Sequence, residues 1–221
     1  MKSAKVLFVE ARKNDSFFDS EIRMFTGNAA GALETLPKSF LIVYTIQYKY
    51  MAERLKLFFE KNGKKVSGVM QVLGCTILKT KENNILLIGS GRFHALQLAL
   101  QGKSLYVYEN GKISKINKSD IDKLLLSKKI ALSKFLSSEI VGILISSKAG
   151  QNNLAVALSL KKRIEKLGKK SFLFISDTIS TRELENFNID FWVNTACLGI
   201  AVYDDSKNVV NYTELDSILH I

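Results

Sequence analysis

The sequence is short of several features that would each define a class of protein. No apolar run among its 221 residues approaches the roughly 20 that a membrane-spanning helix needs. The amino-terminal stretch contains only four consecutive apolar residues, Val6–Val9, too few for the core of a signal peptide. We therefore expect a cytoplasmic protein that does not associate with a membrane.

Cysteine and histidine are scarce, with two of each. Cys75 and Cys197 lie far apart, so no Cys-x-x-Cys spacing indicates a zinc site, and a structural disulfide is rare in a cytoplasmic chain. From composition alone, the two cysteines are most simply interpreted as buried, inert thiols. His94 follows a Gly-x-Gly turn and His220 lies at the carboxyl terminus, and no order of His, Asp and Ser supports a hydrolytic triad.

Acidic residues are outnumbered, 21 against 32 basic ones, which gives a net charge of +11. Such a surface can indicate a polyanionic partner. However, the lysines are spread over the whole chain, there is no arginine-rich run, and few aromatic residues lie between the basic ones. A solvated, lysine-rich surface is therefore the favoured interpretation; DNA is not an expected partner, and a basic RNA-binding α/β module is kept as an alternative.

What the chain does have is an alternation of short apolar runs and helical apolar stripes, which is typical of α/β proteins. The spacing predicts strands at Lys5–Ala11, Phe40–Tyr44, Lys65–Val72, Ile85–Ile88, Leu105–Tyr108, Val141–Ile145, Ser171–Ile175 and Phe191–Val193. It predicts helices at Met51–Phe59, Phe93–Leu100, Ser119–Leu136, Ala157–Leu167 and Thr213–Leu219, with a further helix starting near Ser180. Lys13–Leu36 is weakly periodic and is predicted as a connector or a weak helix, and Glu109–Gly111 as a hairpin turn.

The chain also contains an internal repeat. Glu60–Lys65 reads EKNGKK and Glu165–Lys170 reads EKLGKK, and the same offset carries the strand at Ile85–Ile88 onto the strand that precedes Asn194. We therefore predict an α/β fold of two Rossmann-like βαβ modules with parallel sheets and right-handed crossovers. The predicted parts are 1–36, the last strand of a missing first module with a connector; 37–138, which holds Cys75; and 139–221, which holds Cys197.

Two loops carry residue types suited to an anionic ligand. Gly89-Ser90-Gly91 follows a strand and precedes a helix, where backbone N–H groups can hold a phosphate or carboxylate. Lys148, Gly150 and Gln151 lie between another strand and helix. Neither loop has the third glycine of a dinucleotide fingerprint or the pattern of a Walker motif, so a plain turn and a solvated lysine loop stay open as alternatives.

Taken together, the motifs resemble the archaeal-type diphthamide synthases, the 2-(3-amino-3-carboxypropyl)histidine synthase family. The likeness extends over almost the whole chain, and both cysteines stand in family positions. The motifs that carry it are Val9–Arg12, Tyr44–Gln47, Gln71–Cys75, Ile88–His94, Lys148–Gln151 and Asn194–Cys197.

The resemblance implies three α/β modules that each give one cysteine to a 4Fe-4S cluster, so Cys75 and Cys197 are expected to be metal ligands. It also implies that S-adenosylmethionine binds at the open iron and that its 3-amino-3-carboxypropyl group is transferred to a histidine of translation elongation factor 2. The residues expected to contact the cofactor or S-adenosylmethionine are Gln47, Gln71, Gly89, Ser90, Gly91, His94, Lys148, Gly150, Gln151 and Asn194.

The chain departs from the family pattern where it has Tyr48 for a histidine, Ala95 for a proline and Leu198-Gly199 for Pro-Arg. Because Val6–Arg12 resembles the last strand of the first module, we expect a separate chain to supply that module and its cysteine. The resemblance further implies an electron donor and allows for a dimer of the completed unit. The alternatives are a non-catalytic partner or scaffold subunit with an incomplete cluster site, and a quinolinate-synthase-like enzyme with three modules around an iron–sulfur cluster.

Overall fold

The computed structural model describes residues 15–27, 29–73, 76–89, 92–203 and 208–216. Its contacts divide the chain into two compact units, Met1–Asp122 and Lys123–Ile221, and helix α5 (Lys118–Ser137) carries the chain from one to the other. No helix of the described residues is long and apolar enough to cross a membrane. The predicted division at residues 37 and 139 stays a prediction, and Val6–Arg12 lies outside the described residues.

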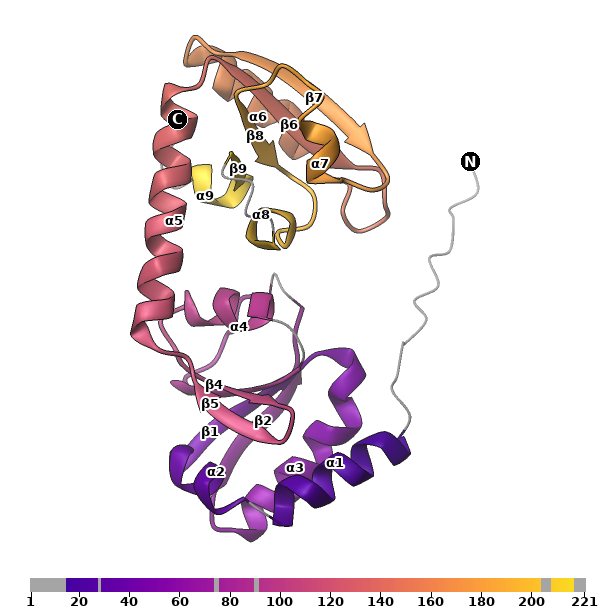
Figure 1. The fold of residues 1–221 in the computed structure, drawn as a ribbon, viewed down its shortest axis with the longest axis vertical. Coiled ribbons are helices and arrows are strands. Elements are labelled where there is room, and N and C mark those ends of the chain that lie inside the picture. Colours follow the sequence, from indigo (N-terminus) through magenta and orange to yellow (C-terminus); the bar gives the residue numbers. More distant parts are fainter. Residues whose placement is uncertain (1–14, 28, 74–75, 90–91, 204–207, 217–221) are drawn as a thin grey trace. The chain divides into compact units, whose positions relative to one another are not determined.

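The first unit is built on a five-stranded sheet in the order β2-β1-β3-β4-β5 (Figure 1). The first four strands in that order are parallel, and β5 is antiparallel to β4. The strands are β1 (Ser39–Tyr44), β2 (Lys65–Gln71), β3 (Asn84–Ile88), β4 (Ser104–Glu109) and β5 (Lys112–Lys115). The helices are α1 (Asp15–Gly27), α2 (Ala30–Thr35), the 3-10 turn η1 (Ile46–Tyr48), α3 (Lys49–Lys61) and α4 (Arg92–Ala99).

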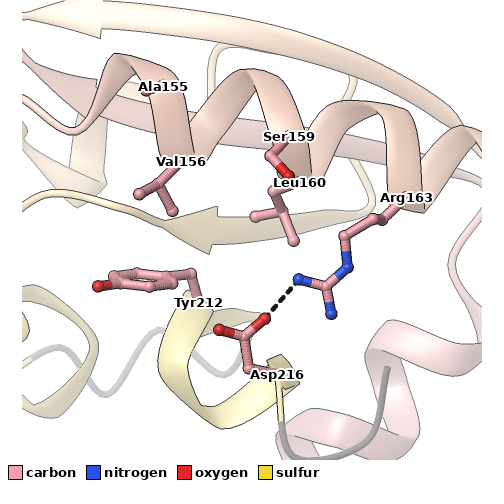
Figure 2. Close-up of a pocket in the computed structure, with 7 residues that line it drawn as sticks. All are labelled: Ala155, Val156, Ser159, Leu160, Arg163, Tyr212 and Asp216. Carbon is pink, nitrogen blue, oxygen red and sulfur yellow. Dashed lines mark hydrogen bonds and ion pairs between the residues drawn. The ribbon is translucent and has the colours of Figure 1, made fainter. Parts of the chain in front are cut away.

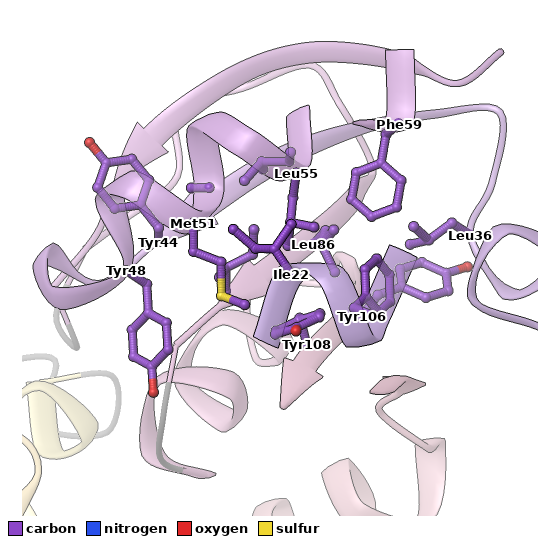
Figure 3. Packing of buried hydrophobic residues seen from close by; sticks show 14 of the residues in the cluster. Ile22, Leu36, Tyr44, Tyr48, Met51, Leu55, Phe59, Leu86, Tyr106 and Tyr108 are labelled. Atoms are coloured by element: carbon purple, nitrogen blue, oxygen red, sulfur yellow. The ribbon is translucent and has the colours of Figure 1, made fainter. Parts of the chain in front are cut away.

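Both faces of this sheet are covered. On one face α3 buries Met51, Leu55 and Phe59 against the strands, and α1 adds Phe18 and Phe25 to the same cluster (Figure 3). On the other face α4 packs Ala95, Leu98 and Ala99 against β1 and β3. The weakly periodic segment before residue 37 therefore forms two helices, and α1 is held by tertiary packing, which the local sequence pattern does not show.

The second unit repeats this arrangement. Its sheet has the order β7-β6-β8-β9 and is parallel throughout (Figure 1). The strands are β6 (Ile140–Ser146), β7 (Lys170–Ser176), β8 (Phe191–Asn194) and β9 (Val209–Asn211). The helices are α6 (Leu154–Lys166), α7 (Thr181–Leu184), α8 (Ile200–Tyr203) and α9 (Tyr212–Asp216).

The order β7-β6-β8-β9 matches β2-β1-β3-β4, so the predicted fold of two repeated parallel α/β modules is confirmed. The repeated hexapeptides end equivalent helices, α3 and α6, and start equivalent strands, β2 and β7. Gly63 and Gly168 have φ angles of 76° and 80°, the left-handed conformation that favours glycine at a helix end.

The prediction did not include β9, whose three residues are too short to show a period of two. The hairpin turn is present between β4 and β5, with positive φ at Asn110 and Gly111 as a two-residue turn of this kind requires.

Candidate iron–sulfur and S-adenosylmethionine site

In the first unit, the predicted site residues gather at the carboxyl edge of the sheet. Gln71 ends β2 and pairs with Tyr44 at the end of β1, which in turn pairs with Ile88 at the end of β3. Gln47 is exposed in the turn η1 that follows β1, and Gly89 follows β3 directly. Ligands of open α/β sheets bind at this edge, so the geometry suits the predicted role.

Gly89 is tightly packed against Thr45. A Cβ atom at this position would lie 3.1 Å from Thr45 Oγ1 and 3.3 Å from Thr45 Cγ2. Thr45 is itself buried, and its N–H donates to the Ile88 carbonyl over 3.2 Å. Thr45 therefore fixes the start of the glycine turn; it lies in the motif Tyr44–Gln47 but was not among the predicted site residues. Ser90 and Gly91, the rest of that turn, lie outside the described residues, as does Cys75.

His94 lies in the first turn of α4 and is partly buried. Burial lowers the pKa of this imidazole, because an apolar environment disfavours the charged ring. A neutral imidazole can accept or donate a hydrogen bond at neutral pH.

Two of the departures from the family pattern have packing roles here. Tyr48 is buried and its ring centroid lies 5.4 Å from that of Phe18 on α1. Ala95 is buried with the strands β1 and β3 on the α4 face of the sheet.

In the second unit, the loop after β6 holds Lys148, Gly150 and Gln151 in a tight turn. The Gln151 N–H donates to the Lys148 carbonyl over 3.1 Å, and Gly150 has a φ of 80°. The backbone N–H of Lys148 donates to Ser146 Oγ, and its side chain is exposed. The turn therefore presents an exposed cationic side chain at the carboxyl edge of this sheet.

Cys197 lies in the loop after β8, at the same edge of the second sheet, and it is exposed. The loop is tied to its surroundings on both sides. Asn153, at the start of α6, donates to the Thr195 carbonyl over 2.7 Å, and Thr195 Oγ1 donates to the Leu144 carbonyl of β6, also over 2.7 Å. The structure thus brings the Lys148–Gln151 turn and the Cys197 loop together around the ends of β6 and β8.

Asn194, the last residue of β8, is fully buried. Its Nδ2 donates to the Cys197 carbonyl over 2.8 Å and to Asn211 Oδ1 over 2.7 Å. Asn211 is the last residue of β9 and pairs with Asn194 across the two strands. The sequence analysis missed Asn211, and the available signal was an apolar pair followed by a polar residue at Val209–Asn211.

The donors at this edge suit an iron–sulfur cluster in part. Cys197 offers an exposed thiol on a loop with several hydrogen bonds, and iron–sulfur clusters bind cysteine thiolates. Within the described residues no group of three or more His, Cys, Asp and Glu side chains could hold a metal ion. Because Cys75 lies outside the described residues, Cys197 is the single thiol whose surroundings the structure describes.

The second unit also has a pocket of about 380 Å³ between α6 and α9 (Figure 2). It is lined by Ala155, Val156, Ser159, Leu160, Arg163, Tyr212 and Asp216. Arg163 and Asp216 form an ion pair of 2.5 Å within it. None of the predicted site residues lines this pocket, and its lining contains no thiol or imidazole, so we do not assign the cofactor to it.

The model of the diphthamide synthesis protein family matches residues 1–220. This chain belongs to the diphthamide synthesis family. The 2-(3-amino-3-carboxypropyl)histidine synthase of Pyrococcus horikoshii is 25% identical over 185 residues, which are 79% of this chain and 54% of that protein. The enzyme of the same name from Methanocaldococcus jannaschii is 28% identical over 172 residues, 76% of this chain and 47% of that one. The chain therefore spans about half the length of these relatives.

A solved structure of the family has the same fold. The crystal structure of Dph2 from Pyrococcus horikoshii matches with a TM-score of 0.78 and 26% identity, over 90% of this chain and 62% of that one. A second structure of the same protein contains a 4Fe-4S cluster. The resemblance read from the motifs is confirmed, and so is the mixed α/β fold with parallel sheets.

Proposed function

We propose that this chain is part of the enzyme that transfers the 3-amino-3-carboxypropyl group of S-adenosylmethionine to a histidine of translation elongation factor 2, the first step of diphthamide biosynthesis. The observation that carries the proposal is the exposed thiol of Cys197 on a hydrogen-bonded loop at the carboxyl edge of a family sheet. Relatives of this chain bear the name of that synthase.

In this proposal Cys75 and Cys197 are ligands of a 4Fe-4S cluster. When bound, such a cluster supplies the electron that cleavage of the carbon–sulfur bond of S-adenosylmethionine requires. The exposed side chain of Lys148 has the charge to bind the carboxylate of that molecule. Gln47, Gln71, Gly89 and His94 stay predicted contacts of the cofactor or of S-adenosylmethionine on the resemblance alone.

A second polypeptide is part of the proposal. The resemblance implies three cysteine ligands, and this sequence contains two cysteines. Relatives from Danio rerio and Encephalitozoon cuniculi are named as subunits 2 and 1 of the synthase. We therefore propose that a separate chain supplies the first module with its cysteine. The second candidate function is a non-catalytic subunit of the same complex, and the subunit names are compatible with either candidate.

The test is iron and sulfide quantification on the full chain, purified without oxygen and reconstituted, alone and with the chain that carries the first module. Cys75→Ala and Cys197→Ala should each lower the iron per chain by about tenfold or more, since even an outer-shell partner of a metal is worth that factor. Ser180→Ala is the matched control, because Ser180 occupies the position that corresponds to Cys75 in the repeat and makes no side-chain cap hydrogen bond.

Iron content that is unchanged in both cysteine variants would overturn the cluster assignment. Turnover of S-adenosylmethionine by the reduced complex distinguishes the two candidate functions. If complexes with Cys75→Ala or Cys197→Ala turn over S-adenosylmethionine at the wild-type rate, the catalytic groups belong to the other chain. This chain is then the non-catalytic subunit.

A further inference from the structure

The backbone of the Cys197 loop is held by two asparagine side chains beneath it. Asn194 Nδ2 donates to the Cys197 carbonyl over 2.8 Å, and Asn211 Nδ2 donates to the Leu198 carbonyl over 3.1 Å. The two asparagines are directly paired on β8 and β9 and joined by a hydrogen bond of 2.7 Å from Asn194 to Asn211. Their exposed fractions are 0% and 1%, so the whole arrangement is buried.

The hydrogen bonds of Asn194 account for its entire donor capacity. A carboxamide has two N–H bonds, and those of Asn194 go to Cys197 and Asn211. Its Oδ1 accepts the backbone N–H of Ala196 over 3.0 Å. A side chain committed in this way has no N–H left for a bound molecule, and its bonds run instead to the Cys197 loop and to Asn211.

Asn211 is oriented in turn by a carboxylate. Its Nδ2 lies 3.5 Å from Glu214 Oε1 on α9, and Glu214 forms an ion pair of 2.8 Å with Lys128 on α5. Outer partners of this kind fix the orientation of the groups that hold a metal ligand. The loop is therefore supported by side chains from β8, β9 and α9.

The two bonds to carbonyls also set the direction of the loop N–H groups. In a planar trans peptide the C=O and the following N–H point in opposite directions. Since the carbonyls of Cys197 and Leu198 point to the buried asparagines, the N–H groups of Leu198 and Gly199 point away from them. Hydrogen bonds from backbone N–H groups to sulfur are one of the factors that set the potential of an iron–sulfur cluster.

We propose that Asn194 and Asn211 are positioning residues for Cys197. They hold the carbonyls of residues 197 and 198 inward, so that the exposed thiol is presented on the outer side of the loop and the N–H groups of Leu198 and Gly199 point away from the asparagines. The inference rests on the proposed function, in which Cys197 is a cluster ligand. It replaces the ligand role of Asn194 with a structural role toward that ligand.

Asn211→Asp tests the inference, because the carboxylate keeps the size and the acceptor oxygen of Asn211 and loses its N–H. The new carboxylate then faces the Leu198 carbonyl and Glu214. Asn208→Asp is the matched control: Asn208 directly precedes β9, is exposed, and accepts from Lys134 Nζ over 3.0 Å, which an aspartate retains. The variant also loses an amide N–H, but that group donates to the Asp190 carbonyl over 3.3 Å and not to the Cys197 loop.

The first measurement is hydrogen exchange of the backbone N–H groups of the loop, followed by mass spectrometry on the full chain. Asn211→Asp should speed exchange at Thr195 and Ala196 by about tenfold, the factor that one lost buried hydrogen bond is worth. Asn208→Asp should leave it unchanged. If Asn211→Asp does not fold, Asn211→Leu replaces it, since leucine removes the same N–H without adding a buried charge.

The second measurement is made on the anaerobically reconstituted protein. Asn211→Asp should bind about tenfold less iron, and the electron paramagnetic resonance signal of its remaining reduced cluster should shift in g values, whereas Asn208→Asp should match the wild type. Equal exchange in the two variants would overturn the inference. Faster exchange with an unchanged signal and iron content would show that the pair only stabilises the fold, which overturns its role toward the ligand.

Failure of the proposed function is detected separately. If Cys197→Ala retains its iron, Cys197 is not a ligand, and the positioning role falls with it. The exchange measurement involves no iron and therefore reports on the two asparagines in either case.

Discussion

Gly142→Ala should destabilise the second unit strongly, although it adds a single methyl group. Gly142 on β6 is paired with Trp192 on β8. A Cβ atom at residue 142 would lie 2.3 Å from both Cε3 and Cζ3 of the Trp192 ring, where an ordinary contact begins at 3.4 Å. The ring or the strand must therefore move by about 1 Å to accept the methyl group.

The surroundings of Trp192 decide the magnitude. The ring is 5% exposed and its centroid lies 4.7 Å from that of Phe174 in a T-shaped contact. Overpacking of a core costs about 1–3 kcal/mol, and expelling a tryptophan altogether costs about 3–5 kcal/mol. Strained packing costs less free energy than expelling the ring. Because the ring is buried and packed against Phe174, we expect a loss of about 2–3 kcal/mol in the free energy of unfolding.

Urea unfolding followed by tryptophan fluorescence measures this loss, since Trp192 is the sole tryptophan of the chain and reports on the second unit. A comparison in the Trp192→Leu background, followed by circular dichroism, is the control. There the ring atoms are gone, so Gly142→Ala should cost less than about 1 kcal/mol. A loss below about 0.5 kcal/mol in the wild type, or the same loss in both backgrounds, would refute the reasoning.

Two further predictions concern ionisable groups. Asp190 accepts the N–H groups of Ile140 and Glu139 over 2.8 and 2.9 Å, and these bonds lower the pKa of its carboxyl group. A carboxyl with a lowered pKa in the folded state stabilises the protein above its unfolded value of about 3.9 and loses that contribution as the pH falls below it. Asp190→Ala should therefore reduce the free energy of unfolding at pH 7 and leave less acid sensitivity below pH 4, in urea titrations at several pH values; an unchanged acid profile would contradict this. For His94, whose pKa is lowered by burial, an NMR titration of the ring should give a midpoint below the ordinary histidine pKa of about 6.5, and a midpoint at or above it would show that the ring is solvated.

Helices and turns that depend on local sequence patterns could be predicted before the fold was known. The apolar stripe of Met51, Leu55 and Phe59 is a helix because side chains three and four residues apart share one helical face. Gly63 and Gly168 end equivalent helices because each needs a positive φ, which is a property of the residue itself. The repeat predicted two parallel modules and the motifs predicted the family, and both predictions are confirmed.

The residues that support the candidate site could be identified only from the folded chain. The resemblance implied that Asn194 contacts the cofactor or S-adenosylmethionine, and the fold shows that its amide is buried and bonded to the loop and to Asn211. Strand β9, which carries Asn211, has three residues, and it is a strand because it pairs with the edge of β8. A close approach such as that of Gly142 to Trp192 depends in the same way on the register between two strands. Contacts between residues far apart in the chain leave no periodic trace in either segment, and for that reason they become visible only once the chain is folded.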